Sequence, residues 1–285
     1  MVGMTVWAEV CQAVNAAWSV PSGCVGLSGL LPVGQVGPAG AVAAPLLPIL
    51  RGHGGYVRGA QFSPDGQQIL TLSDDRTARL WEARSGKPLA TLSGHSGILN
   101  AAVFSPDGAL VVTASNDHTA RLFRVADGRT VALLAGHSAD VRAATFAPDS
   151  KRVATASGDG TVRLWDSGGR LLQVLRAHGK DAVTAVFAPD GQRVLSASLD
   201  GSLREWDATT GQPTARSTAL VPAITSLAEG INPGEWITGH EDGQLRRWSA
   251  DLTLLPQTWP LGGAGMVKAL VRHPAGTEYV ALDGS

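Results

Sequence analysis

The sequence predicts an all-β protein, a β-propeller of four-stranded antiparallel blades with five recognisable repeats, a partial sixth and a possibly incomplete ring. The first observation is a nine-residue segment that recurs five times in the 285 residues. The copies end at positions separated by 42, 42, 41 and 42 residues. A period in the low forties made of short strands is typical of a propeller blade. The second observation is that residues 45–285 lack the 3.6-residue apolar periodicity of helices. The copies read SDDRTARLW (73–81), SNDHTARLF (115–123), SGDGTVRLW (157–165), SLDGSLREW (198–206) and HEDGQLRRW (240–248).

Each repeat opens with a histidine, and an aromatic residue nine positions later ends the first expected strand. The histidines follow Gly52, Gly94, Gly136 and Ala177, and the aromatic residues are Phe62, Phe104, Phe146 and Phe187. A Pro-Asp turn comes next, at 63–66, 105–108, 147–150 and 188–191. Pro early and Gly late suit a tight hairpin turn, because Pro presets φ and Gly tolerates positive φ.

The second half of each repeat supplies three further strands. A short apolar run such as 68–72 or 193–197 is followed by an acidic tight turn and by the strand that ends in Trp or Phe. A second glycine turn leads to a fourth strand such as 88–92. Turn signals every eight to twelve residues are those expected of a four-stranded unit. These second turns contain Gly86, Gly128, Gly169 and Gly211.

These residues resemble the WD40 family of β-propellers, over residues 45–285, and a bacterial-type member is expected from the excess of Arg over Lys. The resemblance implies a hydrogen-bonded tetrad of His, Ser or Thr, Asp and Trp in each blade. The matching residues are His53, Thr71, Asp75 and Trp81; His95, Thr113 and Asp117, with Phe123 in place of Trp; His137, Thr155, Asp159 and Trp165; His178, Ser196, Asp200 and Trp206; and Thr238, Asp242 and Trp248, with no His near Leu220.

Such a network has a physical basis that does not depend on the family. Buried polar side chains must pair, and a closed network of them stiffens a blade. Phe123 has no N–H, so blade 2 is expected to be weaker by about 1 kcal/mol if its partner group is left without a bond.

Residues 1–44 form an uncharged leader rich in Gly, Pro and Ala, and residues 45–285 form the propeller domain. No charged side chain occurs between Val10 and Leu50, which is long enough for a membrane span, but its prolines and glycines weaken a helix. Three interpretations stay open: a disordered or misassigned leader, a membrane-associated segment, and a cleaved export signal. Both cysteines, Cys11 and Cys24, lie in this leader, so no disulfide scaffold is expected.

The end of the sequence predicts a partial blade at 266–285. Residues 267–276 look like a first strand and turn, and 277–282 like a second strand. Residues 45–51 look like the fourth strand of a last blade, because propellers usually close by pairing strands from both termini. We therefore expect a fragment of a six- or seven-bladed ring. The alternatives are an arc closed by a partner or by self-association, and one mixed closing blade.

Several kinds of chemistry are disfavoured. Ser or Thr, His and Asp recur with Trp in the repeats, whereas a catalytic triad is built once, so we expect no enzyme. One histidine per blade is too far from the next for a shared metal, and no phosphate-binding loop motif occurs, so we expect no metal or other cofactor. A net charge of −1 offers no basic field for nucleic acid.

An arginine lies two residues before each blade aromatic, on the same strand face. We expect these arginines to pair with turn carboxylates or to stack on aromatic rings, and a basic ring for an anionic ligand is the alternative. They are Arg79, Arg121, Arg163, Arg204 and Arg246.

The resemblance also implies a binding rim, formed where the histidine loops and the acidic turns open. Its candidate residues lie at the entrance of the inner strand and directly before the tetrad Asp, and they differ between blades. Tyr56, Arg58 and Arg142 are preferred as anchors, because Tyr and Arg are favoured in interfaces. The full set is Tyr56, Arg58, Asp74, Ile98, Asn100, Asn116, Asp140, Arg142, Gly158, Asp181, Val183, Leu199 and Glu241.

The leading functional hypothesis is a non-enzymatic, cytoplasmic scaffold that binds a protein or peptide through this rim. The second is a regulatory or sensor segment of a larger bacterial signalling or defence protein. The third is a propeller enzyme with chemistry in the central channel. Fold alone does not choose among them.

Overall fold

The computed structural model describes residues 49–217, 221–230, 232, 234–260, 265–272 and 279–283. This part of the chain consists of strands and turns. It offers no helix of the length and apolarity that a membrane crossing requires. The leader, residues 1–44, lies outside the described residues, and so do the interpretations that concern it.

Five antiparallel sheets of four strands form the blades, in agreement with the predicted fold class. Blade 1 contains β1 (Val57–Phe62), β2 (Gln68–Ser73), β3 (Ala78–Glu82) and β4 (Pro88–Leu92). Blade 2 contains β5 (Leu99–Phe104), β6 (Leu110–Ser115), β7 (Ala120–Arg124) and β8 (Thr130–Leu134). Blade 3 contains β9 (Val141–Phe146), β10 (Arg152–Ser157), β11 (Thr161–Asp166) and β12 (Leu171–Arg176). Blade 4 contains β13 (Ala182–Phe187), β14 (Arg193–Ser198), β15 (Leu203–Asp207) and β16 (Pro213–Arg216). Blade 5 contains β17 (Ile224–Glu229), β18 (Trp236–His240), β19 (Gln244–Trp248) and β20 (Leu254–Pro260).

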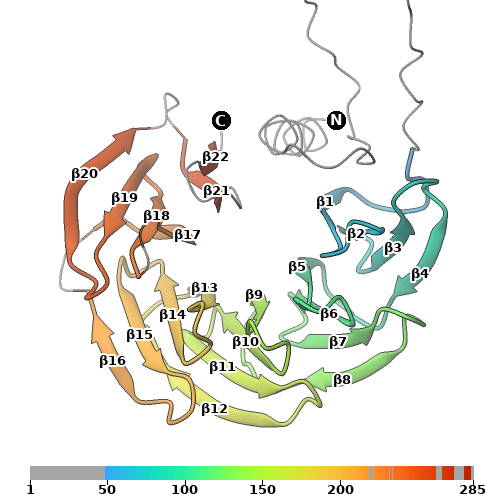
Figure 1. Cartoon of the computed structure of the whole chain (residues 1–285), viewed down its shortest axis with the longest axis horizontal. Coiled ribbons are helices and arrows are strands. Elements are labelled where there is room, and N and C mark those ends of the chain that lie inside the picture. Colours follow the sequence, from blue (N-terminus) through green and yellow to red (C-terminus); the bar gives the residue numbers. More distant parts are fainter. Residues whose placement is uncertain are drawn as a thin grey trace, which may run out of the picture.

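The blades follow one another around an arc (Figure 1). The fourth strands, β4, β8, β12, β16 and β20, lie along its outer circumference. Strands within a blade are joined in sequence order, so every pairing is a hairpin. Successive strands therefore run between two rims. One rim carries the histidine loops and the acidic turns, and we call it the His-loop rim. The other carries the Pro-Asp turns.

Left-handed backbone marks the turns between strands. Gly66, Gly108 and Gly191 have φ of 69°, 73° and 67° in the Pro-Asp turns, where blade 3 has Ser150 at 60°. An L-residue is strained at such a φ, because its Cβ approaches the following carbonyl oxygen. Glycine is therefore the residue that these turns favour, and the serine shows that the hairpin geometry prevails over the local preference.

The core lies between neighbouring blades rather than in one centre. Leu70 and Leu80 of blade 1 pack in one buried cluster with Phe104 and Phe123 of blade 2. Equivalent clusters join blades 2 and 3, blades 3 and 4, and blades 4 and 5. Each blade is thus stabilised by apolar burial against its neighbours, at roughly 25 cal/mol per Å².

A sixth, two-stranded sheet packs against blade 5. It contains β21 (Val267–Arg272) and β22 (Tyr279–Asp283), and the buried Val267 and Leu270 share a cluster with Ile237 and Leu245. Residues 45–48 of the expected closing strand lie outside the described residues, and residues 49–51 belong to no strand. Among the described residues, 49–51 pair with no strand. The described strands do not form a closed ring.

Candidate binding rim

A buried hydrogen-bond chain underlies the His-loop rim in blade 3. The Trp165 indole donates to the Thr155 hydroxyl at 2.9 Å, and that hydroxyl donates to His137 Nε2 at 2.8 Å. His137 Nδ1 donates to an Asp159 carboxylate oxygen at 2.9 Å. The direction of each bond follows from the two ends, because an indole only donates and a carboxylate only accepts. The network therefore fixes the neutral histidine with its proton on Nδ1.

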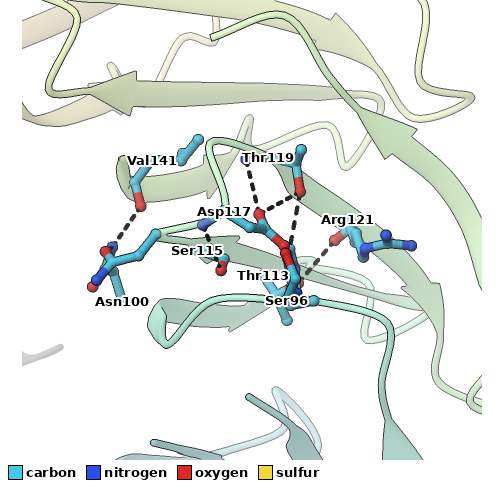
Figure 2. A network of polar contacts seen from close by, with 10 residues as sticks. Ser96, Asn100, Thr113, Ser115, Asp117, Thr119, Arg121 and Val141 are labelled. Carbon is cyan, nitrogen blue, oxygen red and sulfur yellow. Dashed lines mark hydrogen bonds and ion pairs between the residues drawn. The ribbon is translucent and has the colours of Figure 1, made fainter. Parts of the chain in front are cut away.

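Blade 1 has the same chain, and blade 2 has it without the indole. In blade 2, His95 lies 2.8 Å from both the Thr113 hydroxyl and the Asp117 carboxylate (Figure 2 shows the surrounding contacts). Phe123 is buried in the apolar cluster between blades 1 and 2. The Thr113 hydroxyl keeps His95 as a partner. Blade 2 was expected to be less stable if the replacement of Trp by Phe123 left a polar group without a hydrogen bond. No described group of this network is left so, and the reason for that expectation falls away.

Blade 4 contains a looser version of the network. His178 Nε2 lies 2.9 Å from the Ser196 hydroxyl, which also accepts from the Trp206 indole at 3.1 Å. On the other side of the ring, the Ser202 hydroxyl lies 3.0 Å from Nδ1, whereas the Asp200 carboxylate is 3.5 Å away. Ser202 in turn donates to Asp200 at 2.6 Å. In blade 4 the hydroxyl is thus nearer to Nδ1 than the carboxylate is. In blades 1 to 3 the carboxylate is the nearer group, at 2.8–2.9 Å, and the equivalent threonine hydroxyl lies at 3.3–3.5 Å.

Blade 5 departs from the expected tetrad, because Asp242 does not join it. The Asp242 carboxylate pairs with the Arg246 guanidinium at 2.6 Å instead. The imidazole comes from His240 inside β18, which lies 2.7 Å from the Thr238 hydroxyl, while the Trp248 indole donates to the same hydroxyl at 2.8 Å. His240 Nδ1 donates to the Pro222 carbonyl at 2.9 Å. A backbone carbonyl therefore replaces the carboxylate.

The sequence carries a signal for this replacement. His240 stands where the other repeats have Ser73, Ser115, Ser157 and Ser198. Each of those serines accepts a hydrogen bond from the backbone N–H of the tetrad Asp. A histidine in that register reaches the threonine two residues earlier, because alternate residues of a strand share one face. The missing histidine of the loop is supplied by the neighbouring strand.

The networks shift the pKa of their members. Burial lowers the pKa of His178 and of His240 to about 4. The Asp200 carboxylate raises the pKa of His178 and the Pro222 carbonyl raises that of His240, but burial has the larger effect. Hydrogen bonds from Thr119 and His95 outweigh burial and hold the pKa of Asp117 at about 2. At neutral pH His178 and His240 are therefore uncharged and Asp117 is ionised, and their hydrogen bonds hold the fold together.

The predicted rim positions meet in pairs. In each blade, the residue before the tetrad Asp position donates its backbone N–H to the carbonyl at the entrance of the inner strand, at 2.9–3.1 Å. This contact sets two variable residues per blade at nearly fixed positions on the His-loop rim. The pairs are Asp74 with Tyr56, Asn116 with Ile98, Gly158 with Asp140, Leu199 with Asp181, and Glu241 with Ala223.

Some rim side chains also contact one another. Arg58 pairs with Asp74 in blade 1, and the Asn100 amide donates to the Asn116 amide oxygen at 2.6 Å in blade 2. Arg142 of blade 3 pairs with Asp181 of blade 4, so this contact crosses two blades. These contacts join predicted positions within blade 1, within blade 2 and between blades 3 and 4.

Two candidates differ from this pattern. Val183 is partly buried against the core between blades 4 and 5. Tyr56 makes no side-chain contact among the described interactions and is 75 % exposed. Tyr56 is therefore the more accessible of the two for a partner.

The five arginines before the blade aromatics do not behave alike. Arg246 pairs with a turn carboxylate, as the sequence predicts. In the other four, the buried Nε finds no acceptor. In blade 3 the guanidinium of Arg163 lies so close to Gly136 that a Cβ there would be 2.2 Å from Nη1. The loop glycine of blades 1 to 3 thus makes room for an arginine. The four arginines with an unpaired Nε are Arg79, Arg121, Arg163 and Arg204.

Comparison with known proteins gives the family. Four consecutive segments of the chain match the family model described as WD domain, G-beta repeat, at residues 45–82, 86–124, 128–166 and 169–207. Together they cover more than half of the chain. The chain belongs to the WD40-repeat family. WD40 repeats generally mediate protein–protein interactions, and the family is generally a non-enzymatic scaffold.

Curated relatives share single segments with this WD40 protein. It is 59% identical over 34 residues to Apoptotic protease-activating factor 1 of Rattus norvegicus and of Homo sapiens, which is 12% of this chain and 3% of each relative. It is 48% identical over 42 residues to Nuclear distribution protein PAC1 of Yarrowia lipolytica, which is 15% of this chain and 9% of the relative. Each match spans less than a tenth of the relative's length. These relatives are eukaryotic, so the bacterial source stays a prediction.

Proposed function

We propose that this WD40 chain binds a protein or peptide through the His-loop rim of its blades. The observation that carries the proposal is the backbone contact, repeated in every blade, that sets two variable residues on this rim. The hydrogen-bond networks beneath hold these positions rigidly. A rigid surface loses little conformational entropy on binding, which favours affinity.

Tyr56, Arg58 and Arg142 are the proposed anchors. The Tyr56 ring is exposed, and the side chains of Arg58 and Arg142 are 49% and 44% exposed although each pairs with a carboxylate. Exposed ion pairs contribute about 0–1 kcal/mol to stability. These arginines are therefore available to a partner, and their replacement leaves the fold intact.

The proposal is tested with peptides selected from a displayed random library on the purified chain. The double variant Arg58→Ala/Arg142→Ala should bind the selected peptide at least tenfold more weakly, because a lost charged hydrogen bond costs about 1.5–3 kcal/mol. Fluorescence anisotropy measures the affinity, and thermal melting confirms that the fold is retained.

The matched control removes two exposed cations from the opposite rim. Arg129 and Lys151 lie in turns there, and Arg129 has a side chain that is 83% exposed. Arg129→Ala/Lys151→Ala should keep the affinity of the unchanged chain. A chain that selects no peptide, or an equal loss in both double variants, contradicts the proposal.

The second candidate function is a regulatory segment of a larger signalling or defence protein. Its support is the 59% identity over 34 residues to a segment of Apoptotic protease-activating factor 1. In that case the partner of the rim is another domain of the same protein. The Arg58 and Arg142 variants would then weaken binding to that domain when it is supplied as a separate chain.

A further inference from the structure

Blade 4 places two arginines directly opposite each other at the outer edge of the propeller. Arg204 of β15 and Arg216 of β16 are cross-strand partners in the antiparallel ladder. Side chains in such a pair lie on the same face with Cβ atoms about 4.5–5.5 Å apart, and like charges in this position are destabilising. The corresponding cross-strand partners of Arg79, Arg121 and Arg163 are Thr91, Leu133 and Val174. The doubled cation is therefore peculiar to blade 4 among the first four blades.

Neither cation is neutralised by a described carboxylate at hydrogen-bond distance. The buried Nε of Arg204 has no acceptor, and Arg216 is exposed. Asp200 attracts Arg204 only from a distance, because its own oxygens take Ser202 and the backbone N–H of Gly179. In blade 5 the equivalent Arg246 is neutralised by Asp242.

The loop of blade 4 also differs next to Arg204. In blade 3 the Arg163 guanidinium occupies the space where a Cβ on Gly136 would lie. The equivalent loop residue in blade 4 is Ala177, which is fully buried and carries that Cβ. The guanidinium of Arg204 is therefore excluded from the place that its counterpart takes. Its charge also reaches the tetrad, because Arg204 and Arg216 both lower the pKa of His178.

We propose that Arg204 and Arg216 form a binding site for a phosphate group on a peptide. Two adjacent guanidinium groups match the charge of a phosphate, which is about −1.5 to −2 at neutral pH. A carboxylate ligand has a single negative charge and would neutralise only one of the two arginines. Guanidinium groups also bind phosphate through paired N–H donors. The site is separate from the rim anchors and does not depend on them.

The position of the site favours a peptide over a lipid surface. β16 is the edge strand of its sheet, so its outer backbone groups are free to pair with an extended chain. A lipid surface is recognised by clusters of about 4–8 basic residues, whereas this site has two. A phosphorylated segment lying along β16 would therefore satisfy both the guanidinium groups and the strand edge.

The test uses fluorescent nine-residue peptides with a central phosphoserine and degenerate flanks, together with the same peptides carrying serine. Fluorescence anisotropy should show at least tenfold tighter binding of the phosphoserine set. Arg216→Gln should remove most of this difference, as expected for a lost charged hydrogen bond. Arg216 is exposed, so this variant keeps its fold, and Arg204→Gln is compared after its melting temperature has been checked.

The control is Arg129→Gln, because Arg129 is an exposed arginine just before the outer strand of blade 2. It should bind the phosphoserine set within twofold of the unchanged chain. Equal binding of serine and phosphoserine peptides overturns the proposal, and so does an equal loss in Arg129→Gln and Arg216→Gln. Arg216-dependent binding of vesicles containing phosphatidylinositol phosphates, without binding of the peptides, overturns the peptide assignment.

A second readout locates the ligand. Bound phosphate would offset the field of the two arginines at His178 and raise its pKa from about 4. A pH titration of the His178 ring signals by NMR, with and without the phosphoserine peptide, measures this change. A peptide that binds without shifting the His178 pKa lies elsewhere and contradicts the assignment.

Discussion

At the scale of single residues, the buried histidines are held neutral, and this sets the pH dependence of folding. The folded-state pKa of His178 and of His240 is about 4, below the value of about 6.5 in an unfolded chain. Between these values the unfolded state binds more protons. The contribution of these two histidines to stability is therefore fully present above pH 6.5 and is lost as the pH falls towards 4. The pKa values of Asp117 and Asp200 are about 2, so these carboxylates lose their contribution only in stronger acid.

We predict that the free energy of unfolding falls as the pH is lowered from about 6.5 to about 4. Each of the two histidines should account for a loss on the order of 3 kcal/mol over this range. Denaturant unfolding at several pH values measures it. His240→Gln should be less stable at pH 7 but show a flatter descent. The exposed turn residue His118 provides the control, and His118→Gln should keep the slope of the unchanged chain. A stability that is constant over this range contradicts the prediction.

At the scale of the elements, glycines in the turns serve two purposes that the sequence alone does not separate. Gly108 and Gly201 both have a left-handed backbone, with φ of 73° and 77°. At Gly108 an added Cβ would meet only Pro64, at 3.8 Å. At Gly201 it would lie 2.2 Å from the Val221 carbonyl oxygen, in the loop that leads to blade 5. The first glycine relieves backbone strain, and the second also allows two blades to approach closely.

Alanine substitution should separate these purposes. Gly108→Ala is expected to cost about 1 kcal/mol, the strain of a non-glycine residue in this conformation. Gly201→Ala is expected to cost at least about 2 kcal/mol, because the turn or the neighbouring loop must also move. Urea denaturation of both variants gives the comparison. Equal losses would show that the close contact with Val221 has no energetic consequence.

At the scale of the whole molecule, the junctions between blades are not equivalent. The position before the blade aromatic is a buried leucine in blades 1 to 3, at Leu80, Leu122 and Leu164. Blade 4 has Glu205 there, which is 5% exposed and pairs with Arg193 at 2.9 Å. In blade 5 the charges are reversed: Arg247 stands at the position of Glu205, Glu235 stands at the position of Arg193, and the two pair at 2.7 Å. Polar junctions therefore begin where the apolar pattern of the first three blades ends.

We predict that Glu205→Ala destabilises the chain by about 2 kcal/mol, because Arg193 Nη1 and the Thr214 hydroxyl both lose their acceptor, although Arg193 Nε keeps Asp190. Arg193→Leu/Glu205→Leu should recover most of this loss, since it reproduces the apolar pair that blade 2 has at these two positions, Leu110 and Leu122. Chemical denaturation measures both variants. A double variant that is no more stable than Glu205→Ala contradicts this explanation.

The extent of sequence-based prediction follows from these examples. The strands, their hairpin turns and the positions of the rim residues repeat at a fixed interval, so the sequence predicts them well. The network of blade 5 could not be predicted in the same way. His240 replaces a loop histidine from a different strand, and Asp242 turns to Arg246 instead. A replacement of this kind can be recognised only in the folded structure, because the substituting residue lies at a different position of the repeat.

The sequence by itself determined the blades of this protein, because short strands, turn residues and apolar alternation are local properties that recur about every 42 residues. Tertiary structure decided what each polar residue does. It joined Arg142 of blade 3 to Asp181 of blade 4, and it set Arg204 opposite Arg216 without a carboxylate partner. The physical reason is that hydrogen bonds and ion pairs act over a few ångströms, and only the packing of strands and blades brings distant residues that close.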